Sequence, residues 1–125
     1  MKRKVGLYPL GYEQVHLYLE SGEDSRVRII TDRAGAEIYL GGDQSKWESV
    51  VFSLLHEAGE LSLLRHSCRY YQTYDLSSDN GSYVFIMTHT QFSQCLYPVA
   101  EFLTACMDDL KKAWKKWPSG KKGGK

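Results

Sequence analysis

The period of the apolar residues changes once along this chain, between residues 40 and 47, and that change constrains the fold more than any other feature. Residues 14–20 alternate between apolar and polar side chains, which is the pattern of a strand with one buried face. From residue 47 to residue 64 the apolar side chains instead recur every three or four positions, as on one face of a helix. A chain that keeps the two periods in separate segments is expected to fold as an α+β domain.

We expect three to four strands in an N-terminal antiparallel sheet. Three segments have strand character, residues 14–20, 26–31 and 36–40, and short turns containing Gly or Asp separate them. Connections this short favour antiparallel pairing between successive strands.

A central helix is expected at about residues 46–67. Ser45 and Glu48 have the spacing of a capping box at the start of the helical pattern.

A strand and a second helix are expected to follow. A nearly continuous apolar run predicts a strand at about residues 82–88 that is covered on both faces. Thr88 and Gln91 then repeat the capping pattern and predict a C-terminal helix at about residues 89–116. Pro98 is expected to kink or restart this helix.

Length and composition indicate one cytoplasmic domain. The chain of 125 residues has the size of a single domain, which we expect at residues 1–117, followed by a disordered basic tail at 118–125. The three cysteines include no CxxC pair, so they indicate buried thiols in a reducing compartment rather than a disulfide framework. Because no apolar run has the length of a signal-peptide core or a membrane span, no membrane partner is expected.

One turn of the central helix carries residues suited to metal chemistry. His56 and Glu60 are four positions apart, so both project from the same side of a helix and could bind one cation, with Glu57 beside them. Phe52 and Leu63 fall on that same side of a helical wheel. Because a solvated face seldom carries two large apolar residues so close together, we expect this side to be covered and His56 and Glu60 to line a cleft.

The segment His-Glu-Ala-Gly-Glu at residues 56–60 resembles the zincin signature HExxH, with the second histidine replaced by glutamate. The resemblance implies a metal-dependent peptidase or other hydrolase in which Glu57 takes a proton from a metal-bound water. It also implies an edge strand beside the helix for binding an extended peptide, a part that residues 36–40 could play. Three tyrosines after the helix could offer a hydroxyl to a developing oxyanion: Tyr70, Tyr71 and Tyr74.

A third metal ligand must come from outside this turn, since catalytic zinc sites usually have three protein ligands and a water. His66 matches the spacing of the longer metzincin pattern, but on a continuous helix it lies about 15 Å further along the axis than His56. We therefore predict His89, where the strand expected at about 82–88 meets the C-terminal helix, as the third ligand beside His56 and Glu60. Two imidazoles and one carboxylate suit Zn²⁺, and they also suit a non-haem Fe(II) centre.

A second class of function stays open, in which the chain is a non-catalytic protein-interaction domain of the kind that phages and mobile elements encode. The small size, the three Trp and the nine Tyr agree with an aromatic surface that contacts a peptide or protein partner.

A weaker alternative is nucleic-acid binding through the C-terminal helix. Lysines interleave with tryptophans there, and aromatic rings among cations can stack bases. The residues concerned are Lys111, Lys112, Trp114, Lys115, Lys116 and Trp117. The net charge of only +1 and the acidic pair at residues 108–109 argue against a nucleic-acid partner.

Overall fold

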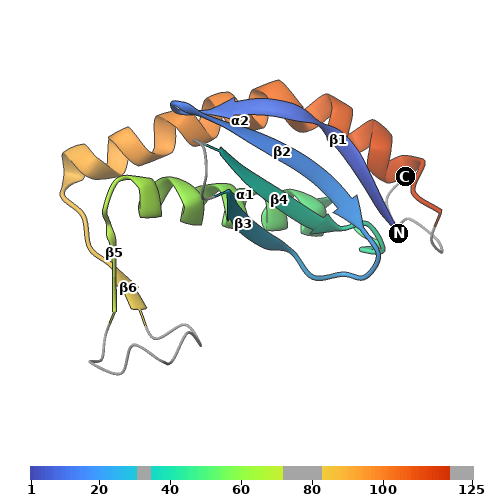
Figure 1. Cartoon of the computed structure of the whole chain (residues 1–125), viewed down its shortest axis with the longest axis horizontal. Helices are drawn as coiled ribbons and strands as arrows, with labels where there is room; N and C mark the ends of the chain where they lie inside the picture. The colour runs from blue at the N-terminus through green and yellow to red at the C-terminus, as the bar shows by residue number, and fades with distance from the viewer. Residues whose placement is uncertain (31–34, 72–82, 119–125) are drawn as a thin grey trace.

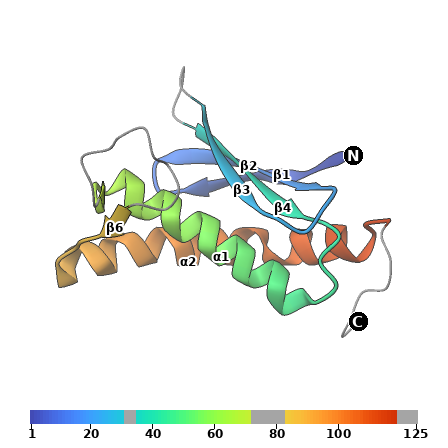
Figure 2. The ribbon, with the colours of Figure 1, turned by 90° about the horizontal axis from the view of Figure 1, so that it is seen from below.

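The computed structural model describes residues 1–30, 35–71 and 83–118, and it shows a four-stranded sheet with two helices on one face (Figures 1 and 2). The sheet contains β1 (Lys2–Leu10), β2 (Glu13–Glu20), β3 (Arg26–Ile30) and β4 (Gly35–Gly41). The helices are α1 (Trp47–Arg65) and α2 (His89–Lys115), with β5 (Arg69–Tyr71) and β6 (Tyr83–Phe85) between them. The expected α+β class is confirmed. The expected tail at 118–125 falls, apart from Pro118, outside the described residues.

The sheet is mixed, which corrects the expectation of purely antiparallel pairing. Its strand order is β1-β2-β4-β3, and β4 pairs in parallel with β2 and antiparallel with β3. Strand β4 is therefore central, so residues 36–40 do not form the edge strand that the zincin resemblance allowed there. Strands β2 and β3 pair with its two edges, and its side chains are buried on both faces, with Ile38 and Leu40 in the core and Tyr39 4% exposed among neighbouring side chains on the other face.

Strand β1 was not among the three segments with strand character. Its alternation is broken where the pairing with β2 shifts register between Lys4 and Gly6. A bulge of this kind moves the following side chains to the other face, so a test for strict alternation does not detect the strand.

The core lies between the sheet and the two helices. The predicted apolar face of β2, made of Val15, Leu17 and Leu19, is fully buried. The helices contribute further residues to the same cluster, among them Leu54, Ala58 and Leu61 from α1 and Phe102, Cys106, Leu110 and Trp114 from α2. Figure 2 shows both helices on the same side of the sheet, and the described elements leave its other face uncovered.

One of the two expected capping boxes is formed. The Thr88 hydroxyl accepts from the Gln91 backbone N–H at 3.1 Å, and the Gln91 side chain accepts from the Thr88 N–H at 2.9 Å. Helix α1 instead has Lys46 as its N-cap, with an extended backbone and no side-chain cap. Ser45 therefore lies one residue too early to cap the helix. Helix α2 runs through Pro98 without a restart.

The short ladder of β5 and β6 is separate from the main sheet. The run at 82–88 was expected to be a strand covered on both faces. Of its described residues, 83–88, Tyr83–Phe85 form strand, and Phe85 and Ile86 are 41% and 59% exposed. Within the part of the chain that the structure describes, the run pairs with β5, and part of its apolar surface is exposed.

Candidate functional site

Helix α1 brings His56 and Glu60 together. Nε2 of His56 lies 3.3 Å from Oε2 of Glu60, one turn later. The side of the helix that carries His56 faces solvent, however: the His56 side chain is 53% exposed and Phe52, whose ring lies 5.9 Å from the imidazole, is 65% exposed. The expectation of a second covered side is therefore wrong, because the sheet and α2 pack against the opposite side of α1.

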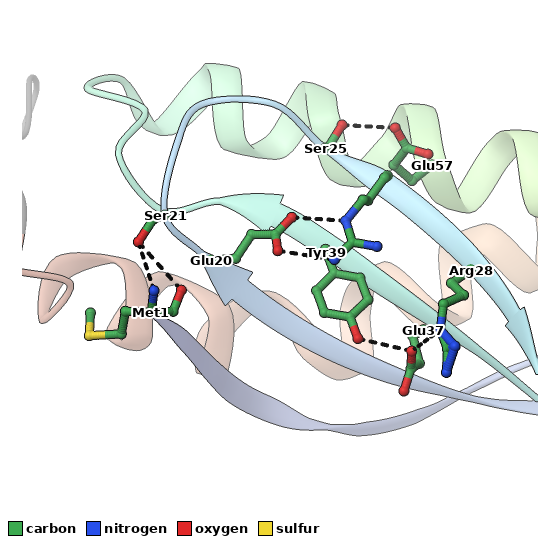
Figure 3. A network of polar contacts seen from close by, with 9 residues as sticks. Met1, Glu20, Ser21, Ser25, Arg28, Glu37, Tyr39 and Glu57 are labelled. Carbon is green, nitrogen blue, oxygen red and sulfur yellow. Dashed lines mark hydrogen bonds and ion pairs between the residues drawn. The ribbon is translucent and has the colours of Figure 1, made fainter.

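Glu57 is buried and does not face the same way as His56. Its Oε2 accepts a hydrogen bond of 2.8 Å from the hydroxyl of Ser25, the residue just before β3 (Figure 3). Neighbouring positions on a helix point about 100° apart, so Glu57 turns toward β3 while His56 turns toward solvent. This placement ties α1 to the sheet and does not support the role of a proton carrier at a metal on His56.

His89 is exposed at the first turn of α2. Over the described ranges, which include His56, Glu60 and His89, no three His, Cys, Asp or Glu side chains are grouped so that they could hold a metal ion. The structure thus brings together two of the three expected ligands, and a Zn²⁺ or Fe(II) centre stays a prediction. Of the tyrosines considered for an oxyanion, Tyr70 is 48% exposed on β5 and Tyr74 lies outside the described residues.

A concave site forms instead where the β1–β2 turn, the end of α1 and the middle of α2 meet. We call it the Pro98 pocket, and its volume is about 370 Å³. The lining residues that matter for its chemistry are Leu10, Tyr12, Glu13, Arg65, His66 and Pro98. A shallower hollow shares His66 and Pro98 with it and continues along α2 to Tyr97.

A two-residue turn sets the shape of one wall of the Pro98 pocket. Leu10 pairs with Glu13 across the hairpin, so Gly11 and Tyr12 form the turn. Gly11 has a φ of 65°, which a glycine adopts without the cost that a side chain would add. The turn leaves Tyr12 fully exposed at the rim and buries Glu13 behind it.

Glu13 is the buried acid of the Pro98 pocket. The residue is 7% exposed, and its Oε2 accepts from Nε of Arg65 at 2.9 Å. Its Oε1 is buried and, within the described part of the chain, has no hydrogen-bond partner. A buried acceptor without a partner typically costs about 1–3 kcal/mol, and more when it carries charge. A ligand that donates to Oε1 would recover that cost, and because Oε1 is closed to solvent, the side chains around it must move to admit the donor.

The hydrogen bonds of His66 define its tautomer. Nδ1 lies 2.8 Å from the carbonyl oxygen of Ser62, and because a carbonyl can only accept, Nδ1 carries the proton. In the neutral ring, Nε2 therefore keeps a lone pair and is a second acceptor at the Pro98 pocket. The Ser62 hydroxyl donates to the Cys95 carbonyl at 2.8 Å, which joins α1 to α2 beside the pocket.

The polar residues of this pocket are not among the sites predicted from the sequence, although one signal of them is present there. The alternation of β2 extends back to residue 13, which places Glu13 on the same face as Val15, Leu17 and Leu19. A carboxylate on the buried face of a strand indicates a partner or a site. Nothing in the sequence pattern shows that Arg65 and His66 meet it there.

The two C-terminal tryptophans are buried, so they cannot stack on bases as the nucleic-acid alternative required. Trp114 and Trp117 are 0% and 4% exposed. Their indole N–H groups donate to the Gln44 carbonyl and to Oδ1 of Asp43, each at 2.9 Å. The end of α2 is thereby fixed to the connection between β4 and α1.

The cysteines Cys68, Cys95 and Cys106 are buried free thiols, as the sequence indicated. The Sγ atoms of Cys68 and Cys95 are 4.0 Å apart. Burial raises the pKa of the Cys95 thiol to about 11 and the pKa of the Cys106 thiol to about 12. Both groups therefore stay protonated near neutral pH and are poor nucleophiles.

Among the described residues, neither α1 nor α2 combines the length and the apolar character that a membrane span needs. Comparison of the chain with protein-family models, with curated proteins and with solved structures gives no match.

Proposed function

We propose that this chain is a non-catalytic protein-interaction domain that holds a basic side chain of a partner polypeptide in the Pro98 pocket. The observation that carries the proposal is Glu13, a buried carboxylate with one unpartnered oxygen at a cavity of about 370 Å³. Cavities of roughly 300–1,000 Å³ with a few polar groups among apolar walls are the usual form of a binding site.

The lining of the Pro98 pocket suits lysine or arginine. Leu10 and Pro98 offer apolar surface to the methylene groups of such a side chain. The carboxylate of Glu13 is an acceptor, and so is Nε2 of His66 in the neutral ring, so a donor suits this lining. Arg65 occupies only the other oxygen of Glu13, and a charge-assisted hydrogen bond to Oε1 would be roughly twice as strong as a neutral one.

The rim of the Pro98 pocket supports a polypeptide rather than a free small molecule as the occupant. Tyr12 is fully exposed at one side, and Tyr97, on the adjoining hollow, is 68% exposed. Tyrosine is enriched where proteins contact one another, because it combines a large apolar area with a polar end.

Titration of ¹⁵N-labelled protein with blocked amino acids tests the proposal. N-acetyl-lysine amide and N-acetyl-arginine amide are expected to shift the amide signals of Gly11 and His66, whereas the uncharged N-acetyl-norleucine amide is not. Glu13→Gln keeps the size of the side chain and should weaken binding about tenfold, since it removes the charge from the acceptor. Glu48→Gln, an exposed acid on the first turn of α1, is the matched control. Equal shifts with norleucine, or equal weakening in the control, would contradict the proposal.

The zincin-like metalloprotein with hydrolase activity is the second candidate, and the 3.3 Å contact between His56 and Glu60 favours it. Calorimetric titration of chelator-treated protein with zinc chloride tests it. Uptake of one Zn²⁺ that His56→Ala abolishes and His66→Ala leaves intact would support a metal site on this helical turn. Failure of the unmodified chain to take up Zn²⁺ would end this candidate.

A further inference from the structure

The sheet face opposite the helices carries a row of side chains that runs across all four strands. The strand registers place Lys4 of β1, Tyr18 of β2, Tyr39 of β4 and Arg26 of β3 next to one another in that order. The two tyrosine rings are stacked, with centroids 4.8 Å apart and planes 11° apart. The row therefore consists of two aromatic rings with one cation at each end.

Cations lie close to both rings of this row. The Arg26 guanidinium carbon is 4.0 Å from the Tyr39 centroid, and Lys4 Nζ is 6.0 Å from the Tyr18 centroid. Lys2 Nζ is 5.1 Å from the Tyr18 centroid and 5.5 Å from the Tyr39 centroid. Lys2 therefore lies within cation–π distance of both rings. Cation–π attraction holds the three cations at this face.

The acidic groups on the same face are already paired with arginines. Glu20 accepts from Arg26, with an ion-pair distance of 3.1 Å, and Glu37 accepts from Arg28 at 2.8 Å (Figure 3). The Tyr39 hydroxyl also donates to Glu37 at 2.9 Å. These carboxylates balance the two arginines of β3, although Glu20 belongs to β2 and lies opposite Lys2 in the strand register.

The β1 side of the face keeps its positive charge. In the described part of the chain, neither Lys2 nor Lys4 has a carboxylate within ion-pair distance. Lys4 Nζ instead lies 2.9 Å from Nδ1 of His16, a contact in which the ammonium donates and the ring accepts. Two exposed ammonium groups thus lie beside an aromatic stack on an open sheet.

We propose that this face binds single-stranded nucleic acid. Lys2 and Lys4 are two positions apart on one strand, about 6.6 Å along β1, so an extended strand can place successive phosphates on them. Lys4 lies at the outer ring face of Tyr18, and its flexible side chain can move onto a phosphate while a base stacks on that ring. Aromatic rings on open sheets bind unpaired bases in this way, whereas the bases of a duplex are already stacked.

The proposal is independent of the Pro98 pocket. It also moves the nucleic-acid surface from the C-terminal helix, where the tryptophans are buried, to the sheet, where Tyr18 is only half-buried.

Fluorescence anisotropy of the full chain with labelled oligothymidylate and oligouridylate of about twelve nucleotides tests the proposal. Salt is varied from about 50 to about 200 mM, because phosphate contacts make the affinity salt-dependent. The double variant Lys2→Gln/Lys4→Gln is expected to weaken binding at least tenfold at the lower salt and to reduce the slope of log K against log salt by about 1.4. The control, Lys115→Gln/Lys116→Gln, removes the same charge from exposed lysines at the end of α2 and should stay within twofold.

The aromatic part of the proposal is tested at Tyr18. Tyr18→Leu is expected to weaken binding at least fivefold without changing the salt slope, because a ring is lost and no charge is. Tyr18→Phe keeps the ring and should bind within twofold of the unmodified chain. Circular dichroism confirms that each variant is folded, and if Tyr18→Leu is not, the lysine pair and its control decide alone. Absence of binding by the unmodified chain, equal weakening by the two lysine pairs, or full affinity in a folded Tyr18→Leu would each overturn the proposal.

Discussion

The hydrogen bond between Tyr8 and Asp109 joins the first strand to the last helix, and removing it should lower the free energy of unfolding measurably. The Tyr8 hydroxyl donates to Oδ2 of Asp109 at 2.8 Å across 101 positions of sequence. A hydrogen bond to a charged group contributes about 1.5–3 kcal/mol. Because Asp109 is exposed and can be hydrated once the hydroxyl is gone, we expect the lower end, about 1.5 kcal/mol for Tyr8→Phe. For a domain of this length that corresponds to about 6 °C in Tm.

The same hydrogen bond makes the free energy of unfolding depend on pH in the alkaline range. Burial first, and the hydrogen bond to Asp109 second, raise the pKa of Tyr8 above its ordinary value of 10. The folded chain therefore keeps this proton in a pH range where the unfolded chain loses it. The contribution of Tyr8 to the free energy of unfolding is fully present below pH 10. It falls by about 1.4 kcal/mol per pH unit as the pH rises above 10 toward the pKa of Tyr8 in the folded chain. The Tyr8→Phe variant has no hydroxyl proton at this position, so its free energy of unfolding lacks this dependence on pH.

Urea unfolding followed by circular dichroism, near pH 8 and near pH 11, measures both effects. The difference between the unmodified chain and Tyr8→Phe should be about 1.5 kcal/mol at the lower pH and close to zero at the higher. A double-mutant cycle with Asp109→Ala should give a coupling of about 1 kcal/mol. A coupling below about 0.3 kcal/mol, or a difference that is the same at both pH values, would refute the reasoning.

Three further predictions concern glycines and thiols. Gly59→Ala should stabilise the protein by about 0.5–1 kcal/mol, because a Cβ there meets open space and glycine is unfavourable inside a helix. Gly41→Ala should destabilise it by about 1–3 kcal/mol, because the new Cβ would overlap the backbone of Glu23, and thermal melts of the two variants should shift in opposite directions. The thiols of Cys95 and Cys106, with pKa values raised to about 11 and about 12, should resist iodoacetamide near pH 8 until guanidinium unfolds the chain. Mass spectrometry counts the labels, and rapid labelling of either thiol in the folded protein would contradict its burial.

The helices could be predicted closely because their signals are local. The pattern at about 46–67 corresponds to Trp47–Arg65, and the pattern at about 89–116 corresponds to His89–Lys115. Thr88 lies at the right offset from Gln91 to form its cap, and that geometry involves only one turn of chain.

The order of the strands depends on contacts that alternation alone does not specify. Strand β4 pairs in parallel with β2 because β3 lies at the sheet edge and leaves a space beside β2 for β4. The sequence of the turns around β3 does not indicate that β3 lies there and not beside β2. The dense apolar content of β4 at Ile38, Tyr39 and Leu40 was nevertheless typical of a strand with neighbours on both sides.

The two candidate sites also differ in whether their contacts join residues that are close in sequence. The spacing of His56 and Glu60 predicted their contact, because it arises within one helical turn. Whether that turn faces a cleft or water depends on where the sheet and α2 pack. Phe52 led to the wrong expectation of a covered side, because the sequence does not distinguish an exposed phenylalanine from a buried one. The Pro98 pocket joins Glu13 to Arg65 across 52 positions, a separation at which a single sequence carries no spacing signal.

The attachment of Trp114 and Trp117 to residues 43–44 has a consequence for the chain during its synthesis. These indoles reach acceptors made 70 and 74 positions earlier. At roughly 5–20 residues per second, a ribosome needs roughly 4–15 seconds to deliver them after their acceptors. Throughout that interval the sheet and the first helix expose the apolar surface that the last helix will cover. A nascent chain stalled before residue 114 should therefore bind chaperones and be cleaved by proteases, whereas a chain that extends past residue 117 and has left the ribosome should be protected from both.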